Sequence, residues 1–462
     1  MFAVSFSIIS ITTGIFLNYT YAFGQLGPAS IWTWPIAAVG QTLVVLVLAE
    51  LATRIPLAGA NYQWASRLVS PTYGWFVGAL GILNLAVGLP GIMLLAASPL
   101  LGYVLGNDAP SPRFTLFLAL LILTVAYLIN VISVQVAARV NNVAVFTEIL
   151  GTVVLAVALF VLWVADYKET DHGIGYLGQA AHPPGQSFWY SAVLASLMGI
   201  YTIVAFEVAA DMSEEAVDAQ RSVPRAMIGA VVISAVLGMI VLIGFAIAVP
   251  NDTVIAEGGL PGVFQYWIGS GLARTFVGIV VFSVFALTVV GAAASARLLF
   301  AMARDNVLPG SKVLARVNPR TLTPLPALLA SYLLCVAVML YGYNSGNAFG
   351  TLVGATALAP YIVYLLTVLA YGAKRRRLET LPGAFNLGRF AVPVFAAAMV
   401  WLVAAVLALS LPETFHQAVY YVVGGLVLAT LWWVFVLRAR FANGTAGTTM
   451  VRDGSDRHTT AG

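Results

Sequence analysis

Long apolar stretches alternate with short polar segments along almost the whole chain. A helix needs about 20 mostly apolar residues to cross a bilayer, and twelve stretches approach or exceed that length. The ninth is short, and the third is long and contains Pro90 and Gly91, which predict a kink. The sequence therefore predicts an all-α membrane protein with about twelve transmembrane helices. They are expected at Phe2–Tyr21, Ile31–Ala52, Tyr73–Leu101, Phe114–Ser133, Val143–Ala165, Phe188–Ala210, Ala226–Val249, Ala273–Leu299, Leu325–Tyr341, Phe349–Tyr371, Phe390–Leu411 and Ala418–Leu437.

The composition supports a membrane environment and disfavours other classes of protein. Hydrophobic residues make up 61% of the chain and charged residues only 9%, whereas a soluble domain carries roughly 25% charged residues. The net charge of +4 does not indicate a nucleic-acid partner, because the positions of the basic residues have a better explanation. The single cysteine, Cys335, lies in an apolar run. We therefore expect no disulfide-linked partner and no thiolate metal centre.

The basic residues predict how the helices are oriented. If the amino terminus is cytoplasmic, 19 of the 22 Lys and Arg residues fall in cytoplasmic segments, and only Arg113, Lys168 and Arg274 fall on the other side. Cytoplasmic loops of membrane proteins carry such an excess of Lys and Arg. We therefore expect a multi-pass protein of the cell membrane, an inner or plasma membrane, with both termini cytoplasmic.

The first and sixth predicted spans contain residues that weaken a continuous helix. Ser7–Phe16 and Ser196–Glu207 place glycine, hydroxyl and β-branched residues near mid-membrane. Glycine and β-branched residues lower helix propensity, and hydroxyls can satisfy backbone groups that a break sets free. In transporters built from inverted repeats, corresponding helices are broken and the substrate binds at the breaks, where helix amino termini attract carboxylates and carbonyls accept from ammonium groups. The alternative is that these small residues only permit close helix packing.

Four groups of residues, in order along the chain, form a more specific pattern. They are Phe6–Ser10 through Gly14–Phe16 with Gly27–Pro28; Ala49–Leu51 with Pro56–Ala65; Ala205–Glu207 with Ser213–Glu215 and Val223–Ala226; and Ser295–Arg297 with Ala303–Gly310. Together they resemble the amino acid–polyamine–organocation (APC) superfamily of permeases, nearest the bacterial and fungal branch of amino acid, GABA and choline permeases. The resemblance runs from Ser5 to about Pro326 and is weaker beyond.

The resemblance implies a LeuT-like fold, in which two inverted repeats of five helices are followed by two extra helices. The repeats would comprise residues 1–165 and 166–372, and the extra helices would comprise residues 373–440. Residues 441–462 would form a disordered cytoplasmic tail, which their content of Gly, Thr and charge also favours. The resemblance also implies that Ser10–Gly14 and Tyr201–Ala205 are unwound.

In the family, the two unwound segments hold the substrate. Here Thr13 and Gly14 occupy the positions whose amide and hydroxyl groups hold the substrate carboxylate. Carbonyls near Ser10, and those of Tyr201 and Val204, would hold the amino group. The ring of Tyr201 would close over the bound substrate.

Two departures from the family pattern would stiffen or narrow the breaks, because Thr12 and Ala205 stand where many members have glycine. Asn84, in the third span, either faces the substrate or bonds to a neighbouring helix. The expected substrate-binding residues are Ser10, Ile11, Thr12, Thr13, Gly14, Tyr201, Thr202, Ile203, Val204, Ala205 and Asn84.

Two glutamates inside predicted spans are candidates for coupling to an ion. Translocon scales put a mid-span charge at about 2.5–3.5 kcal/mol unfavourable, so each needs a reason. Glu148 falls where some proton-coupled relatives carry a lysine, and it would take up a proton; the alternative is a carboxylate near the interface bonded to Asn141 or Asn142. Glu207 follows the break of the sixth span and would either brace the broken backbone or take up a proton.

Two further acidic residues lie near predicted cytoplasmic ends of spans. Glu50 and Asp211 are expected to cap helices or to act as gate partners for Arg67 or Arg297.

The pattern favours a secondary active transporter over other functions. It would import an amino acid, a GABA-like compound or another amine by alternating access, with co-transport of H⁺ or Na⁺. An exchanger or exporter with the same site is the alternative, and a channel is a weaker one, since the chain shows no filter motif. The four histidines do not pair at helical spacing and no phosphate-binding Gly-Lys-Ser/Thr loop occurs, so we expect no enzyme, no catalytic residues, no metal and no cofactor.

Overall fold

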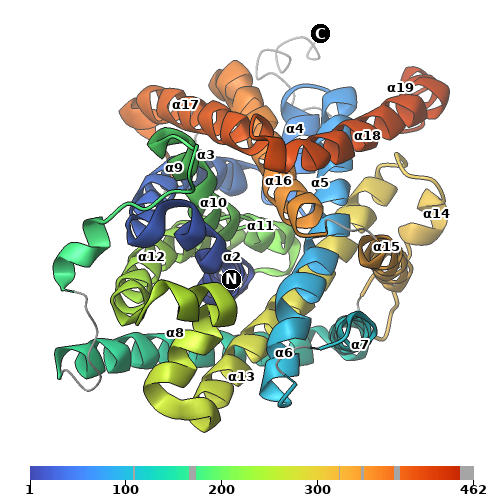
Figure 1. Ribbon diagram of the computed structural model, residues 1–462. Helices are drawn as coiled ribbons and strands as arrows, with labels where there is room; N and C mark the ends of the chain where they lie inside the picture. Colours follow the sequence, from blue (N-terminus) through green and yellow to red (C-terminus); the bar gives the residue numbers. More distant parts are fainter. Residues whose placement is uncertain (108–109, 166–172, 322, 345–347, 379–384, 448–462) are drawn as a thin grey trace.

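In the computed structural model, which describes residues 1–462 except 108–109, 166–172, 322, 345–347, 379–384 and 448–462, every regular element is a helix (Figure 1). This confirms the predicted all-α class. The α-helices are α1 Phe2–Ile9, α2 Ile11–Leu26, α3 Thr33–Arg54, α4 Ala60–Leu68, α5 Pro71–Ile92, α6 Ser98–Val104, α7 Pro112–Ile132, α8 Val134–Val164, α9 Phe188–Ala195, α10 Leu197–Thr202, α11 Val208–Asp211, α12 Ala219–Ala248, α13 Asp252–Arg304, α14 Ser311–Leu314, α15 Leu325–Tyr343, α16 Ala348–Lys374, α17 Ala391–Ser410, α18 His416–Trp432 and α19 Arg438–Ala442. Short 3-10 or π-helical segments are Gly27–Trp32, Met93–Ala97, Ile174–Gly178, Ser213–Glu215, Arg375–Arg377, Gly388–Phe390, Glu413–Phe415 and Trp433–Leu437.

Within the described residues, ten helical runs are long and apolar enough to cross a membrane. One of them, Phe2–Arg54, contains α1, α2 and α3 and so covers the first two predicted spans. The sixth predicted span contains a shorter apolar helix, Phe188–Thr202. The chain is thus a multi-pass membrane protein, and the count of twelve stays a prediction.

The third predicted span contains a π-helical turn just after its proline. Pro90 lies inside α5 and removes a backbone donor. Residues Met93–Ala97 then form a π-helical turn before α6, and the Ser98 hydroxyl donates to the Met93 carbonyl over 2.7 Å. The predicted irregularity at Pro90 is therefore present as a π-bulge.

Helix α13 is not one straight rod. Gly259 and Gly269 have positive φ values of 56° and 74°. Glycine adopts this region without the Cβ clash that other residues meet. The eighth predicted span, Ala273–Leu299, begins after the second of these interruptions.

Helices of the first predicted repeat pack against helices of the second. α2 contacts α10, α3 contacts α12, α5 contacts α13 and α7 contacts α15, so that each helix meets one that belongs to a span five places later. A two-fold axis between two five-helix sets would produce these pairs. The contacts support the predicted division at residues 1–165, 166–372 and 373–440, which remains a prediction.

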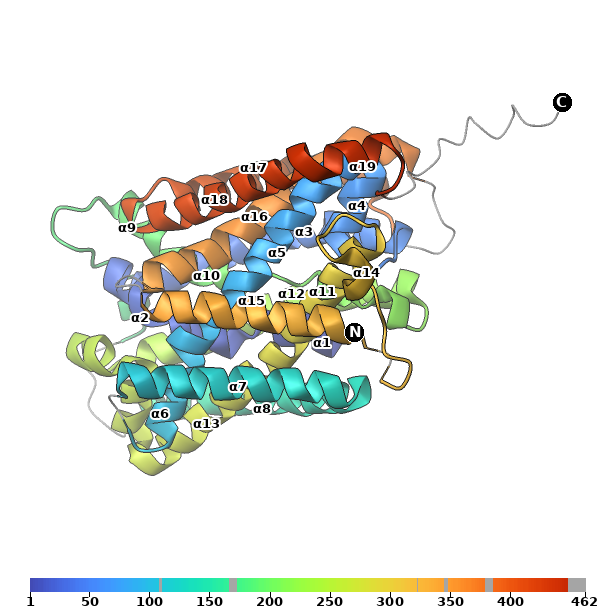
Figure 2. The ribbon, with the colours of Figure 1, turned by 90° about the vertical axis from the view of Figure 1, so that its right-hand side faces the viewer.

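Helices α17, α18 and α19 lie together along one face of the bundle (Figures 1 and 2). The predicted tail starts at residue 441, but the chain up to Gly447 is fixed, because the Gly447 amide donates to the Asp305 carbonyl over 2.9 Å and the Asn306 side chain donates to Thr445 over 2.8 Å. Residues 448–462 lie outside the described part.

The side chain of the single cysteine, Cys335, is buried in α15. It is 1% exposed, and its sulfur lies 3.6 Å from the Tyr127 hydroxyl.

One end of the bundle is rich in arginine, and in Figure 2 the amino terminus, α14 and the end of α19 lie at that end. We call it the arginine-rich end, after Arg54, Arg67, Arg297 and Arg304. Glu50 pairs there with Arg54 over 2.8 Å, so its expected pairing with Arg67 or Arg297 is wrong. The reason is that residues four apart share one face of a helix.

Loops at the arginine-rich end are tied by two further ion pairs. Arg297 donates to both oxygens of Glu215, over 2.7 and 2.9 Å. Arg304 contacts Glu214, which also accepts from the Ala58 amide.

Candidate substrate site

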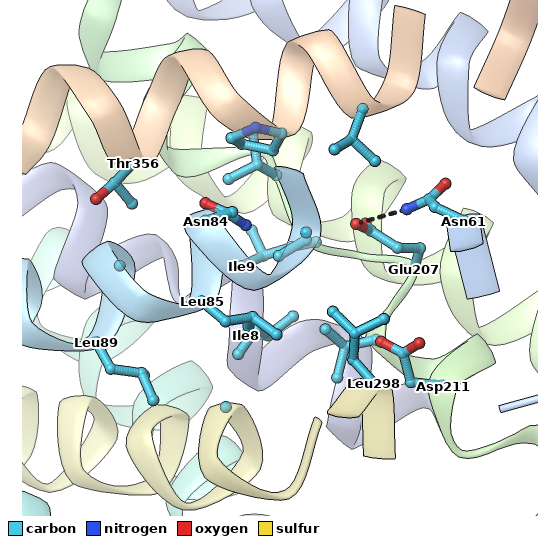
Figure 3. A pocket seen from close by; sticks show the side chains of 18 of the residues that line it. Ile8, Ile9, Asn61, Asn84, Leu85, Leu89, Glu207, Asp211, Leu298 and Thr356 are labelled. Carbon is cyan, nitrogen blue, oxygen red and sulfur yellow. Dashed lines mark hydrogen bonds between the residues drawn. The ribbon is translucent and has the colours of Figure 1, made fainter. Parts of the chain in front are cut away.

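A cavity of about 130 Å³ lies between the interruption of the first predicted span and that of the sixth (Figure 3). Helices α5, α13 and α16 complete its walls. Of the predicted site residues, the cavity brings together Thr13, Gly14, Tyr201, Thr202, Val204, Ala205, Asn84 and Glu207. Ser10, Ile11, Thr12, Ile203 and Glu148 do not line it.

The first interruption is a single residue. Ser10 has φ 36° and ψ 85°, in the left-handed region, between the end of α1 and the start of α2. The Gly14 amide already donates to the Ser10 carbonyl over 3.0 Å. The prediction that Ser10–Gly14 is unwound is therefore wrong in extent, because one left-handed residue is enough to end one helix and start the next.

Glu148, from α8, holds the first turn of α2. One of its carboxylate oxygens accepts from the Thr12 amide over 3.2 Å, from the Thr12 hydroxyl over 2.7 Å and from the Ser10 hydroxyl over 3.1 Å. The side chain is buried, with 2% exposure. A carboxylate at this place also meets the positive end of the α2 dipole. The alternative that Asn141 binds Glu148 is wrong, since neither polar atom of the Asn141 side chain has a partner in the described part of the chain.

The second interruption is longer. Helix α10 ends at Thr202 and α11 begins at Val208, so residues 203–207 are not helical. Ala205, with φ 62°, is left-handed. Tyr201 and Thr202, which were predicted to be unwound, lie in the last turn of α10. The helix persists there because the Ile203 amide still donates to the Gly199 carbonyl over 3.1 Å.

Tyr364, from α16, and Glu207 together brace this second interruption. The Tyr364 hydroxyl accepts from the Ala205 amide over 2.7 Å and donates to Glu207 over 2.5 Å. The other Glu207 oxygen accepts from the Asn61 side chain over 3.2 Å (Figure 3). The Tyr364 ring stacks on Phe206, with 5.4 Å between centroids. This is the bracing arrangement; a proton-coupling role for Glu207 stays a hypothesis.

On one side of the cavity α2 and α10 are in close contact. A methyl group built on Gly14 would overlap the Thr202 side chain. Further along the same helix, Phe16 packs edge to face against Phe245 and Phe264, with centroid distances of 6.3 and 5.5 Å. These contacts fill the space between α2 and its neighbouring helices on that side of the cavity.

In the opposite direction the cavity extends toward the arginine-rich end. Its lining there includes Gly59, Asn61, Tyr62, Asp211 and Leu298. The cavity therefore joins the two interruptions to one end of the bundle.

Three residues of the site were not predicted to take part in it. Tyr364 and Asn61 hold Glu207, and Asp211 lines the cavity. A tyrosine in an apolar span is a weak signal, because interfacial and packing roles are common. Asp211 gave a stronger signal in the sequence, because a carboxylate near a helix break in a membrane span needs a compensating partner. Among the described residues, no three His, Cys, Asp or Glu side chains are grouped to hold a metal ion.

Sequence comparisons place this geometry in a wider context. The profile of a family described as "Amino acid permease" matches residues 1–437. Amino-acid permease BAT1 from Arabidopsis thaliana is 27% identical over 95% of this chain and 91% of its own length. The BAT1 homologue of Oryza sativa is 27% identical over 90% of this chain and 84% of its own. Amino-acid permease 2 of Neurospora crassa is 25% identical over 86% of this chain and 76% of its own length.

Proposed function

Because this chain belongs to the amino acid permease family, we propose that it imports an amino acid or related amine by alternating access. Family membership makes it a multi-pass transporter of amino acids rather than an enzyme. The substrate binds in the cavity between the two interruptions. The observation that carries this proposal is that one cavity reaches both interruptions, the start of α2 and the 203–207 segment.

The chemistry of the lining suits a small substrate with an amino group. The first turn of α2 presents Thr13 and Gly14 to the cavity. The Gly14 amide is bonded within the turn, so the Thr13 amide and hydroxyl are the groups that would hold a carboxylate at this helix amino terminus. Carbonyls beside Tyr201 and Val204 accept from an ammonium group. The Asn84 side chain lines the cavity and has no hydrogen-bond partner among the described residues, which supports a substrate contact over interhelical bonding.

The contacts around the cavity support an inward-facing state. We assign the arginine-rich end to the cytoplasm from the Lys and Arg excess, with both termini on that side of the cell membrane. The cavity extends toward this end, while the contact of Gly14 with Thr202 closes the other side. Outward opening then requires α2 and α10 to separate.

A proton taken up by Glu148 is the proposed coupling step. The ionised carboxylate accepts three hydrogen bonds from Ser10 and Thr12. Protonation removes the negative charge that faces the α2 dipole and weakens these bonds. The first interruption is thereby loosened by a residue that does not itself line the cavity, and the contact of Ser10 with Thr13 passes the change to the cavity wall.

Uptake into proteoliposomes tests the proposal. Radiolabelled amino acids should enter in a saturable and competable way, faster when the outside is acidic. Glu148→Gln should flatten the pH profile, whereas Glu257→Gln, an exposed carboxylate far from Glu148 in sequence and outside the site, should keep it. Uptake that requires amino acid inside the vesicle would indicate an exchanger, and uptake that never saturates would overturn the proposal in favour of a channel.

A further inference from the structure

The charged side chains that line the cavity are both acidic. Its lining, within the part of the chain that the structure describes, contains the carboxylates of Glu207 and Asp211 and no lysine, arginine or histidine side chain. The two acids are four residues apart, with Glu207 directly before α11 and Asp211 at its last position. Figure 3 shows both carboxylates on the same wall of the cavity.

Neither carboxylate is neutralised by an ion pair in the described residues. Glu207 accepts from a phenol and an amide, which are both uncharged. Arg297 acts on Asp211 electrostatically, but its Nε and Nη2 donate to Glu215 and its Nη1 donates to the Ala293 carbonyl. Two carboxylates without an ion pair in a cavity with a mostly apolar lining are costly until a positive charge joins them.

The other end of the cavity is less attractive to anions than a bare helix amino terminus would be. Glu148 already accepts hydrogen bonds from the Thr12 amide and hydroxyl, and its carboxyl group lies at the positive end of the α2 dipole. Fewer donors therefore remain for a substrate carboxylate, mainly around Thr13.

We infer that the cavity selects substrates with a net positive charge, whose second ammonium or guanidinium group lies between Glu207 and Asp211. This inference rests on the proposed transport function and narrows its substrate to diamines and cationic amino acids. Asp211 is then a specificity-determining residue, and Glu207 serves both the brace and the cation.

Thermal-shift titration of the full-length purified protein in detergent tests the inference, because a ligand that binds the folded state raises the apparent Tm. The probes are putrescine, L-lysine, L-leucine and GABA. Putrescine and L-lysine should raise the Tm at lower concentration than L-leucine and GABA, which are zwitterions without net charge. Asp211→Asn should weaken L-lysine binding by about tenfold, because it removes one charged hydrogen bond. The Tm response to L-leucine should stay the same.

Asp211 is the better target because it is outside the brace that Tyr364 forms with Glu207. Glu257→Gln is the matched control for loss of one carboxylate, and it should leave every titration unchanged. If L-leucine binds as tightly as L-lysine, or if Asp211→Asn leaves L-lysine binding intact, the inference is wrong while the transport proposal stands. If none of the four probes binds and no amino acid enters proteoliposomes, both are wrong.

Discussion

The two helix interruptions differ in length and in the group that holds them. The first is one residue long, at Ser10, and the carboxyl group of Glu148 from α8 holds the turn that follows it. The second is five residues long, from 203 to 207, and a neutral phenol from α16 holds its backbone. The cavity lies between them.

This difference suits the proposed division of tasks between the two interruptions. In that proposal protonation switches the first, because the strength of its support depends on the charge of Glu148. The second depends on a tyrosine that stays neutral, and it presents the Glu207 carboxylate to the cavity. One interruption would sense the coupling ion and the other would recognise the substrate. Four substitutions test this division.

Glu148→Leu should have the largest effect. It leaves the buried amide and hydroxyl of Thr12 without their acceptor, and each such donor costs about 1–3 kcal/mol. The Ser10 hydroxyl keeps its contact with Thr13. The free energy of unfolding should fall by about 2–6 kcal/mol in detergent, and uptake should be lost. Thr147→Ala is the control, because the half-buried Thr147 lies in the same helix and its hydroxyl donates only to the Val143 carbonyl of that helix. Equal stability of the two variants would show that the carboxylate does not support the first interruption.

Gly14→Ala tests whether α2 and α10 must lie in contact. The added methyl group would overlap Thr202, and overpacking costs about 1–3 kcal/mol. Chemical denaturation should show the lower free energy of unfolding, and the rate of uptake should fall. Gly24→Ala, in the same helix with open space around it, should be neutral or slightly stabilising. If Gly14→Ala behaves like Gly24→Ala, α2 and α10 are not tightly joined.

Tyr364→Phe removes the support of the second interruption alone. The Ala205 amide and Glu207 each lose a partner, and the expected loss is about 2 kcal/mol. The pH profile of the remaining uptake should keep its shape, since Glu148 is untouched. Tyr19→Phe is the control, because the buried Tyr19 hydroxyl has no hydrogen-bond partner in the described residues. A changed pH profile in Tyr364→Phe would contradict separate tasks.

Ala205→Gly should have the smallest effect, and of opposite sign. Ala205 is left-handed, and glycine relieves the strain at the cost of a freer unfolded chain, for a net gain of up to about 1 kcal/mol. Ser10→Gly relieves the same strain but loses the hydroxyl contacts to Glu148 and Thr13, so it should not stabilise the protein. Thermal denaturation of both variants measures the difference. Shifts of the same sign would mean that the two interruptions are held alike.

The fold class followed from the sequence, because apolar length acts locally. The cavity lies beside the small residues of the first and sixth predicted spans, where the sequence placed the candidate site. The extent of each interruption did not follow. Ser10 and Ala205 are left-handed although neither is glycine, and partners far along the chain stabilise them. Pairings such as that of Tyr364 with Ala205 depend on how distant helices pack, which hydropathy does not encode. Asn61 stood within a family motif, yet its contact with Glu207 became visible only in three dimensions.

The buried Cys335 has a practical value for following the transport cycle. It is the chain's single cysteine, it contacts the Tyr127 hydroxyl and it is 1% exposed. Thiol-reactive dyes should therefore not react with it in the folded protein. Pairs of introduced cysteines at the two ends of α2 and α10 would then carry the only labels. Spin-label distances between such pairs would record directly when these helices part.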